Sequence, residues 1–477
     1  MPARIVALPS DAAPTSLEEA LAELRTRLAV PADFPTEVTA AAERAAARPR
    51  LPALDRTDLE LVTIDPPGSR DLDQALHIAR DGQGFEVSYA IADVAAFVAA
   101  GDPVDLEARE RGLTLYAPDL RTPLHPPELS EGAASLLPDQ VRPALLWTLR
   151  LDERGELGEA RVERALVRSR EQLTYEQAQV EIDSGAARPA LALLAEVGRL
   201  REDRERERGG VSLQIPTQEI GVDADGRYTL RFRATLPVEG HNAQISLLTG
   251  MAAARLMLAG RIGVLRTLPP ADPDALRRLR RTAKALHIAW SANQSYPEFV
   301  HSLDPSVPAH AAMLNACTEL FRGAGYVAFD GDLPDQTQHA ALAVDYAHTT
   351  APLRRLVDRW AGETCLALSV GRAVPDWVRS SLPALPDLMT RAEARSKKYE
   401  RAVLDLVEVS LLHDRVGEPF VGTVIDVESD GRRGVVMVAD PAVQARVTGT
   451  DLPLGEEVAL RLTSAEWSTG RVGFALA

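Results

Sequence analysis

Three aspartates crowd a short turn near the start of the chain, in the run TIDPPGSRDLDQAL at positions 63–76. Asp65 ends an apolar run that predicts a strand, and a Pro-Pro-Gly turn then leads to Asp71 and Asp73. Alternate residues of an extended segment share a face, so Asp71 and Asp73 would project together and the turn could return them to Asp65. Converging carboxylates repel one another unless their pKa values rise or a cation binds. The run therefore predicts either turn-capping aspartates or a site for Mg²⁺ or Mn²⁺, because oxygen-only ligation suits these ions better than Zn²⁺.

Two basic segments later in the chain favour the metal-site interpretation. Residues 346–359 read YAHTTAPLRRLVDR, a pattern that predicts a helix opened by Arg354 and Arg355 just after Pro352. Guanidinium groups beside a metal-bound carboxylate are what a phosphodiester transition state needs. Residues 391–401, RAEARSKKYER, hold five basic and two acidic residues and would form a positive strip. A solvated helix face also explains such a run.

The order of the predicted elements indicates an α+β multidomain protein. Residues 1–56 predict two helices, the first with a leucine face at i, i+4, i+7 and i+11 from Leu17, as a helix-turn-helix or a docked helical hairpin. Residues 57–413 predict a mixed α/β domain with strands first and helices later, in which residues 85–94 alternate like a half-buried strand. Residues 417–477 predict five short strands, typical of an OB-type β-barrel or of a structural β-cap.

Charge and composition exclude several classes of protein. The chain has 53 Lys and Arg against 69 Asp and Glu, a net charge of −16, which argues against a protein that coats duplex DNA. A localised basic channel remains compatible with this charge. No stretch has the roughly 18 consecutive apolar residues of a membrane span, and no signal peptide is visible. Cys317 and Cys365 are too few for a disulfide framework, so we expect a cytoplasmic protein with no membrane partner.

Taken in order, these segments resemble the RNB catalytic domain of the ribonuclease II and ribonuclease R family. The resemblance covers about residues 57–412 and is carried by TIDPPGSRDLDQA, YAIADVAAFV, LYAPDLRTPLHPPELSEGAASLLP, HNAQISLLTGMAAARLM and YAHTTAPLRRLVDR. The C-terminal segment is similar to the OB-fold RNA-binding domain that usually follows. The resemblance implies processive 3′-to-5′ hydrolysis of single-stranded RNA to nucleoside 5′-monophosphates, in a channel that only an unpaired strand enters.

The resemblance also implies roles for individual residues. Asp65, Asp71 and Asp73 match metal-binding aspartates of the family, where two Mg²⁺ ions, or Mn²⁺ as a substitute, would activate water and stabilise the leaving oxygen. Arg354 matches the arginine that contacts the scissile phosphate, and Arg355 is its basic neighbour. Three further substrate-binding positions of the family are a base-stacking tyrosine, a contact to the terminal ribose and a glutamate near the terminal nucleotide, here Tyr116, Gln244 and Glu400.

Two substitutions depart from the family pattern. The aspartate motif usually ends in two adjacent aspartates, whereas here Gln74 follows Asp73 and would be the fourth metal ligand, with a weaker hold on one ion. Gln244 stands where the family has a glutamate, although an amide can still hydrogen-bond a 2′-hydroxyl. A catalytically weakened RNA-binding regulator of the same fold is therefore one alternative to an active enzyme. A metal-dependent phosphatase acting on small molecules is another.

The N-terminal segment predicts which RNA the protein accepts. Family members usually begin with two cold-shock-type barrels, whereas about 56 residues precede the catalytic domain here. We therefore expect a more open entrance, in a monomer that takes single-stranded RNA or RNA with a 3′ overhang. Degradation of hairpins should continue into the stem from a short overhang, measured as product length against overhang length. Stalling about ten or more nucleotides from the stem would contradict this expectation.

Overall fold

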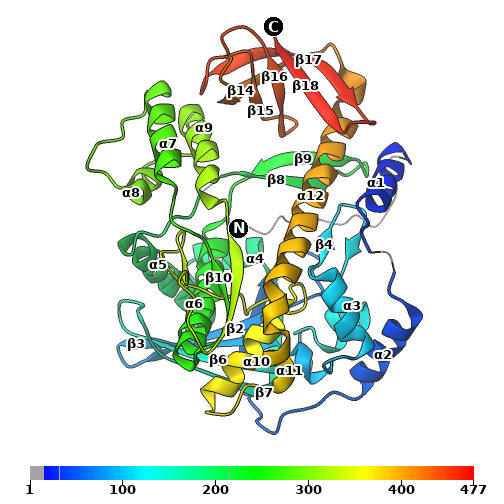
Figure 1. The fold of residues 1–477 in the computed structure, drawn as a ribbon, viewed down its shortest axis with the longest axis vertical. Helices are drawn as coiled ribbons and strands as arrows, with labels where there is room; N and C mark the ends of the chain where they lie inside the picture. The colour runs from blue at the N-terminus through cyan, green and yellow to red at the C-terminus, as the bar shows by residue number, and fades with distance from the viewer. Residues whose placement is uncertain (1–14, 32, 214) are drawn as a thin grey trace.

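The computed structural model describes residues 15–31, 33–213 and 215–477. These residues form two closed β-barrels joined by a helical body (Figure 1). The helices are α1 (Thr15–Arg27), α2 (Thr36–Ala47), η1 (Val94–Ala96), α3 (Pro103–Arg111), η2 (Leu129–Ala133), α4 (Tyr175–Asp183), α5 (Pro189–Glu207), α6 (Pro237–Gly260), α7 (Pro273–Ala285), α8 (Tyr296–His301), α9 (Pro308–Cys317), η3 (Thr318–Phe321), α10 (Val357–Ser369), α11 (Asp376–Ser381), η4 (Leu382–Ala384), α12 (Leu385–Leu412) and η5 (His413–Arg415). The strands are β1 (Leu61–Asp65), β2 (Gln74–Asp81), β3 (Gly84–Ala92), β4 (Leu115–Tyr116), β5 (Arg121–Thr122), β6 (Val141–Leu151), β7 (Leu157–Thr174), β8 (Thr217–Val222), β9 (Tyr228–Arg233), β10 (Ile262–Thr267), β11 (Gly325–Asp330), β12 (Gln338–His339), β13 (Val344–Asp345), β14 (Pro419–Val427), β15 (Arg433–Val438), β16 (Val443–Thr448), β17 (Glu457–Glu466) and β18 (Arg471–Leu476).

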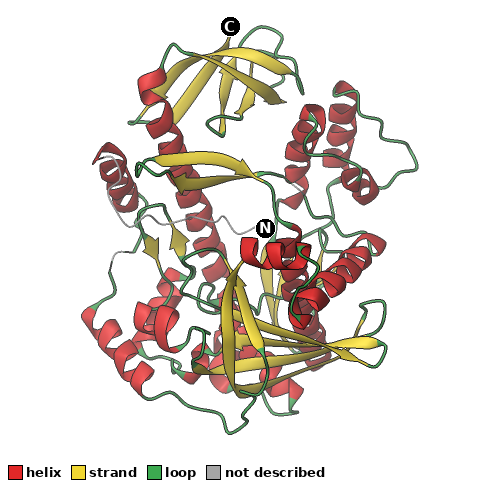
Figure 2. Ribbon diagram, turned by 180° about the vertical axis from the view of Figure 1, so that it is seen from behind, coloured by secondary structure: helices red, strands yellow, loops and turns green. Residues whose placement is uncertain are grey.

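The first barrel consists of β1, β2, β3, β6 and β7, so strands do come early in the long middle domain (Figure 2). β2, β3, β6 and β7 pair antiparallel in sequence order. β1 closes the barrel because it pairs antiparallel with β2 and parallel with β7. Val62 of β1 lies opposite Leu76 of β2, so the end of β1 and the start of β2 share one edge of the barrel. That edge carries the aspartates of the 63–76 run.

Strand β3 is buried on both faces, whereas its alternation predicted a half-buried strand. Val87, Tyr89 and Ile91 lie in a hydrophobic core that also contains residues of α5 and α6. Ala90 and Ala92 lie in a second core with residues of α2 and α3. The alternation therefore predicted the two faces correctly, but helices distant in the sequence cover the face that was expected to meet solvent.

Helix α6 is the core helix of the helical body. It packs against α5, α10 and β10. Its length and apolar composition would suffice to cross a membrane, yet 56% of its most apolar window is buried inside the protein. An apolar helix surrounded by other elements of its own chain is what a buried core requires.

The C-terminal barrel confirms the prediction of five strands over the last segment. Its strand order is β14-β15-β16-β18-β17, in which only β16 and β18 pair in parallel. α12 runs from the helical body to this barrel (Figure 1). α12, the hairpin β8–β9 and the barrel contribute to one hydrophobic core, so the barrel is held by a shared interior.

The two N-terminal helices do not form a single module, contrary to the helix-turn-helix or hairpin that was predicted over residues 1–56. α1 packs against α12, and its Leu17, Leu21 and Leu24 belong to the core of the C-terminal barrel. α2 packs against α3 and belongs to a core of the first barrel. The apolar face from Leu17 is confirmed, but its partner comes from the other end of the chain. Residues 1–14 of the predicted module lie outside the described residues.

A buried carboxyl group joins α12 to the C-terminal barrel. Glu408 is 2% exposed, and its Oε1 accepts hydrogen bonds from Gln218 Nε2 at 2.7 Å and from the Gln444 backbone N–H at 3.3 Å. Burial raises the pKa of Glu408 from its ordinary 4.5 to about 7, although the hydrogen bond from Gln218 lowers it in part. The folded protein therefore retains a proton between pH 4.5 and 7 that the unfolded chain releases, and stability falls as the pH rises through this window.

Glu408→Gln is expected to remove this pH dependence, because the amide keeps an acceptor oxygen and never ionises. At pH 8 the variant should gain up to about 3 kcal/mol in the free energy of unfolding, and at pH 5 it should match the natural protein. Chemical denaturation at both pH values measures the difference. Glu457→Gln, at an exposed position of β17, is the matched control. Parallel stability curves for Glu408→Gln and the natural protein would contradict the burial of an ionisable group at this junction.

Candidate active site

Two of the predicted aspartates lie at the shared edge of the first barrel. Asp65 is the last residue of β1, and Asp73 immediately precedes β2. Asp73 is 3% exposed; its Oδ1 accepts a hydrogen bond from the Leu353 backbone N–H at 2.7 Å, and its Oδ2 lies 3.2 Å from Arg354 Nε. Oδ2 of Asp65 and Oδ2 of Asp73 are buried and accept no hydrogen bond from any described residue. Buried anionic oxygens without a donor are unfavourable, so this edge is poised for a positive charge.

Burial dominates the ionisation of both carboxyl groups. It raises the pKa of Asp65 to about 7 and the pKa of Asp73 to about 8. The positive charge of Arg354 lowers both values in part, and the negative charge of Asp71 raises them. Near neutral pH these groups need either a proton or a bound cation.

The third aspartate, Asp71, pairs with an arginine. Asp71 Oδ1 accepts a hydrogen bond from Arg121 Nη1 at 2.6 Å, and Tyr116 Oη lies 3.5 Å from Asp71 Oδ2. Arg121 also pairs with Glu131 at 2.5 Å. Within the described ranges, no three His, Cys, Asp or Glu side chains are arranged as a ready-made metal site. The charge of Asp71 still raises the pKa of Asp65 and of Asp73, while its own carboxylate pairs with Arg121, so the convergence of the three aspartates on one cation stays a prediction.

Gln74 makes two hydrogen bonds that join separate parts of the site. Its Nε2 donates to the carbonyl oxygen of Thr350 at 2.5 Å, and its Oε1 accepts from Tyr89 Oη at 2.7 Å. Gln74 opens β2, Tyr89 lies in β3, and Thr350 precedes the arginine pair. An aspartate at position 74 has no donor for the Thr350 carbonyl, so the amide has a structural function that a carboxylate could not perform.

The segment with the two arginines is a fixed loop, whereas the sequence predicted that Arg354 and Arg355 open a helix. Helix α10 begins only at Val357. The Ala351 backbone N–H donates to Asp358 Oδ1 at 2.7 Å, in the first turn of α10. The Leu356 backbone N–H donates to the carbonyl oxygen of Gly112 at 3.0 Å, so it is not available to the helical ladder. Long-range acceptors override the helical pattern of this segment.

The two arginines have different environments in this loop. Arg355 donates to both carboxylate oxygens of Asp358, at 2.5 and 2.8 Å, and its side chain is 21% exposed. The Arg354 side chain is 41% exposed, and its closest contact with Asp73 is 3.2 Å, between Nε and Oδ2. Arg354 is therefore placed to contact a ligand, and Arg355 holds the loop.

Helix α6 presents different side chains to its two flanks. Ser246 Oγ lies 2.8 Å from Thr350 Oγ1, and Asn242 hydrogen-bonds Tyr175, whose pKa is raised by burial and by nearby Asp65. Gln244 is buried and donates from Nε2 to Glu205 of α5 at 2.6 Å. Since residues two apart on a helix point in nearly opposite directions, Gln244 faces α5, away from the loop that Ser246 contacts. The structure does not bring Gln244 to the aspartates.

The predicted positive strip on α12 contacts the protein itself. Arg395 donates to the backbone carbonyl of Glu110 at 3.0 Å, and Arg401 pairs with Asp405 at 2.8 Å. Glu393 pairs with Arg266 at 2.8 Å. Glu400 accepts a hydrogen bond from Ser396 Oγ, one turn earlier on the same helix, at 2.7 Å. Much of this strip therefore docks α12 against neighbouring elements.

Sequence reasoning missed the side chains that support the site. Tyr89 fixes the Gln74 amide, and Arg121 pairs with Asp71. A signal for Arg121 was present, because it lies directly opposite Tyr116 across the short hairpin β4–β5. No local signal identifies Tyr89, whose alternation in β3 indicates only a core residue.

The comparisons with known proteins agree with this geometry. The chain matches the family model described as "RNB domain" over residues 54–361 and that described as "RNase II-type exonuclease C-terminal S1 domain" over residues 418–477. It is 28% identical over 403 residues to Ribonuclease R of Escherichia coli, covering 79% of this chain and 49% of that protein. The chain spans about half the length, or less, of the first curated relatives it matches.

Two solved structures share the fold. The apo form of Mycoplasma genitalium RNase R superposes with a TM-score of 0.85 at 18% identity, over 97% of this chain and 78% of that one. Yeast Ssd1, described as a pseudonuclease, gives a TM-score of 0.67 at 16% identity, over 84% of this chain and 52% of that one. The fold therefore occurs both in proteins named as ribonucleases and in a protein described as inactive.

The two hydrogen bonds of Gln74 predict the effect of restoring an aspartate. In EDTA, Gln74→Asp should lower the free energy of unfolding by about 1–3 kcal/mol, because the shorter anion cannot donate to Thr350 and adds negative charge beside Asp73. Urea denaturation measures the loss. Gln74→Leu is the uncharged control: Mg²⁺ should restore stability to the aspartate variant and not to the leucine variant. Unchanged stability in both variants would contradict the bridging function of the amide.

Proposed function

Because the chain belongs to the RNB-domain family, we propose that it is a 3′-to-5′ exoribonuclease that hydrolyses single-stranded RNA to nucleoside 5′-monophosphates. One observation carries the proposal: the partly exposed guanidinium of Arg354 lies beside the buried carboxylate of Asp73, with 3.2 Å between Nε and Oδ2. A guanidinium group beside carboxylate oxygens that could hold a divalent cation suits a phosphodiester, because its transition state gains negative charge. The C-terminal barrel supports a nucleic-acid substrate, since barrels of this type bind single strands.

Asp65 and Asp73 fit a divalent cation such as Mg²⁺, with Mn²⁺ as a substitute. Each has a buried carboxylate oxygen without a hydrogen-bond donor, and burial raises the pKa of both groups. Oxygen ligands of this kind are those that Mg²⁺ prefers. When bound, the cation would supply Lewis-acid activation of water and stabilisation of the leaving oxygen. Asp71 would join these ligands only after exchanging its partner Arg121.

The chain's own residues would orient the RNA in defined ways. Arg354 would bind the scissile phosphate with its terminal nitrogens while Nε stays near Asp73. Asp358 would fix the loop through two contacts, its ion pair with Arg355 and its hydrogen bond from the Ala351 N–H. Arg354 would therefore stay in place before the substrate binds. Tyr116 lies beside Asp71 and would stack its ring on a base, an interaction tolerant of sequence. Pre-positioned groups reduce the reorganisation that the reaction requires.

A catalytically weakened RNA-binding regulator is the second candidate, and Gln74 favours it. Its amide oxygen already accepts a hydrogen bond from Tyr89, and its nitrogen donates to Thr350, so it adds no charge to the cation site. Yeast Ssd1, which shares the fold, is described as a pseudonuclease, and this supports the second candidate. Mycoplasma genitalium RNase R has been solved with ribose-methylated single-stranded RNA and with double-stranded RNA, which supports RNA as the ligand under either proposal.

Degradation of 5′-labelled single-stranded RNA in Mg²⁺ tests the proposed activity. We expect a ladder that shortens from the 3′ end, with nucleoside 5′-monophosphates as product by chromatography. Asp73→Asn keeps the acceptor for the Leu353 N–H but loses the charge, so it should abolish the ladder. Arg354→Gln should lower kcat by about 10²–10³-fold. Asp81→Asn, at the exposed far end of β2, is the control and should match the natural protein.

RNA binding separates the two candidate functions. Retention of RNA in a filter or gel-shift assay, with no mononucleotide in Mg²⁺ or Mn²⁺, would overturn the exonuclease and support the regulator. Activity in the natural protein that persists in Asp73→Asn would show that the hydrolysis comes from another site or from a contaminant.

A further inference from the structure

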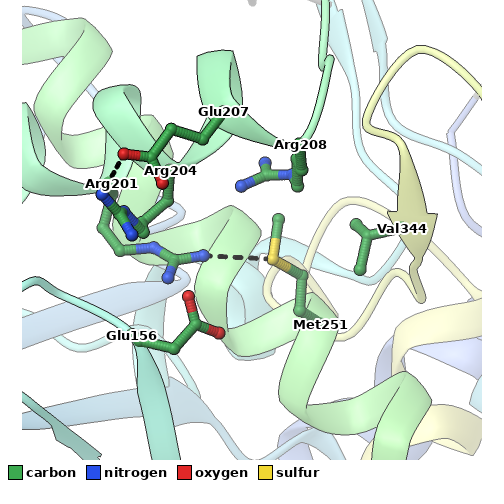
Figure 3. A pocket seen from close by; sticks show the side chains of 7 residues that line it. All are labelled: Glu156, Arg201, Arg204, Glu207, Arg208, Met251 and Val344. Carbon is green, nitrogen blue, oxygen red and sulfur yellow. Dashed lines mark hydrogen bonds and ion pairs between the residues drawn. The ribbon is translucent and has the colours of Figure 1, made fainter.

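A second polar cavity lies at the end of α5 (Figure 3). Its volume is about 350 Å³. It is lined by Glu156 from the turn between β6 and β7, by Met251 of α6, by Val344 of β13, and by four residues at the end of α5: Arg201, Arg204, Glu207 and Arg208. Three guanidinium groups thus share one small space, with two carboxylates at its border.

This cavity and the carboxylate site lie on different flanks of α6. Met251 lines the cavity and follows Gln244 by two helical turns, and Gln244 contacts α5. Ser246, which contacts the loop of Arg354 through Thr350, points to the opposite flank. A ligand in the cavity would therefore be separated from Asp73 by the body of α6.

Arg201 is the arginine of the cavity with the weakest set of partners. It is only 3% exposed, and its Nη1 donates to the carbonyl of Gly155 at 2.7 Å. Its Nη2 faces the sulfur of Met251 at 3.3 Å, and a thioether is a weak acceptor. Its Nε has no hydrogen-bond partner, and no described carboxylate forms an ion pair with it. A buried guanidinium without a counter-ion is costly unless an anion binds to it.

The two neighbouring arginines repeat this pattern. Arg204 pairs with Glu207 through Nη2, while its buried Nε has no partner. Arg208 donates from Nε to the carbonyl of Leu342 at 2.7 Å, while its buried Nη2 has no partner. Each side chain is therefore anchored at one edge and retains an unused donor. Burial, together with the positive charges of Arg208 and Arg204, lowers the pKa of Arg201 to about 10, although the negative charges of Glu156 and Glu205 raise it in part; a bound anion would raise it further.

The carboxylate of Glu156 limits which anion fits. Its side chain points into the same space as the arginines (Figure 3), and its carboxylate makes no ion pair or hydrogen bond with any residue that the structure describes. A ligand that is anionic throughout would be repelled by Glu156, whereas a hydroxyl group could donate to it. The cavity thus offers donors for an anion and an acceptor for a hydroxyl.

We propose that this cavity binds a small phosphate monoester that also carries hydroxyl groups. The phosphate would lie among Arg201, Arg204 and Arg208, where planar guanidinium groups suit its oxygens. The hydroxyl groups would donate to Glu156. Sugar phosphates and mononucleotides share this chemistry, and the cavity volume admits a compound of that size.

Titration calorimetry of the full chain tests the proposal with three probes: inorganic phosphate, ribose 5-phosphate and adenosine 5′-monophosphate. EDTA is present throughout, so that the carboxylate site cannot bind phosphate through a cation. We expect one saturable site with ribose 5-phosphate at least about tenfold tighter than inorganic phosphate, from its additional hydrogen bonds to a charged group. Comparable binding of adenosine 5′-monophosphate identifies a nucleotide site, and loss of binding with the base attached identifies a sugar-phosphate site.

Variants locate the binding in the cavity. Arg204→Gln and Arg208→Gln should each weaken ribose 5-phosphate about tenfold or more, because each removes a charge-assisted hydrogen bond. Arg199→Gln, exposed on the same helix and outside the cavity, is the matched control and should bind as the natural protein does. Glu156→Ala should weaken ribose 5-phosphate and strengthen inorganic phosphate, since it removes both the acceptor and the repulsion. Circular dichroism confirms that each variant is folded.

Three results would overturn the proposal. The first is no saturable binding of any probe at millimolar concentration, which would mean that water alone satisfies the three donors. The second is equal affinity for inorganic phosphate and ribose 5-phosphate, which would remove the hydroxyl contact to Glu156. The third is equal loss of binding in Arg199→Gln and Arg208→Gln, which would indicate a general charge effect. None of these results depends on exoribonuclease activity.

Discussion

The carboxylate of Asp73 is the group on which the arrangement of the site depends. It is buried at a barrel edge, where one oxygen bonds the Leu353 N–H and the other lies beside Arg354. Leaving the buried Asp73 oxygen and the Leu353 N–H unpaired would cost about 1–3 kcal/mol, so this hydrogen bond holds the loop before α10 at the edge. Gln74 adds a second connection between the same strand and the same loop. The barrel and the helical body are therefore fixed to each other where Arg354 emerges.

The net charge of −16 has to be interpreted together with the contacts that the arginines make. Several arginines form ion pairs with buried carboxylates of the protein itself, such as Arg359 with Asp105 at 2.6 Å and Arg355 with Asp358 at 2.5 Å. Basic residues of the run 391–401 on α12 also contact other groups of the protein, as Arg395 and Arg401 do. Arg354 differs because its side chain remains 41% exposed beside buried carboxylates. Attraction for a polyanion thus depends on a few placed groups and not on the overall charge.

Local patterns predicted the elements well and the long-range contacts poorly. The leucine face from Leu17 and the five C-terminal strands were visible because each depends on residues a few positions apart. The closure of the first barrel by a parallel pair of β1 and β7 joins segments about a hundred residues apart, and no periodicity encodes it. The helix predicted at Arg354 begins late for the same reason, since the Leu356 N–H donates to the carbonyl of Gly112, far away in the sequence. Gln74 was recognised as unusual, but its partners Tyr89 and Thr350 are known only once the barrel closes.

Helix α6 explains how one core element can support two different polar environments. Its period of 3.6 residues sends Ser246 toward the loop of Arg354, and Gln244 and Met251 toward α5. On the first flank, one oxygen each of Asp65 and Asp73 has no hydrogen-bond donor; on the second, one nitrogen each of Arg201, Arg204 and Arg208 has no acceptor. The buried apolar side chains of α6 lie between the two flanks, so the groups on one flank do not pair with those on the other. Under our two proposals, a cation would therefore bind on the first flank and an anion on the second.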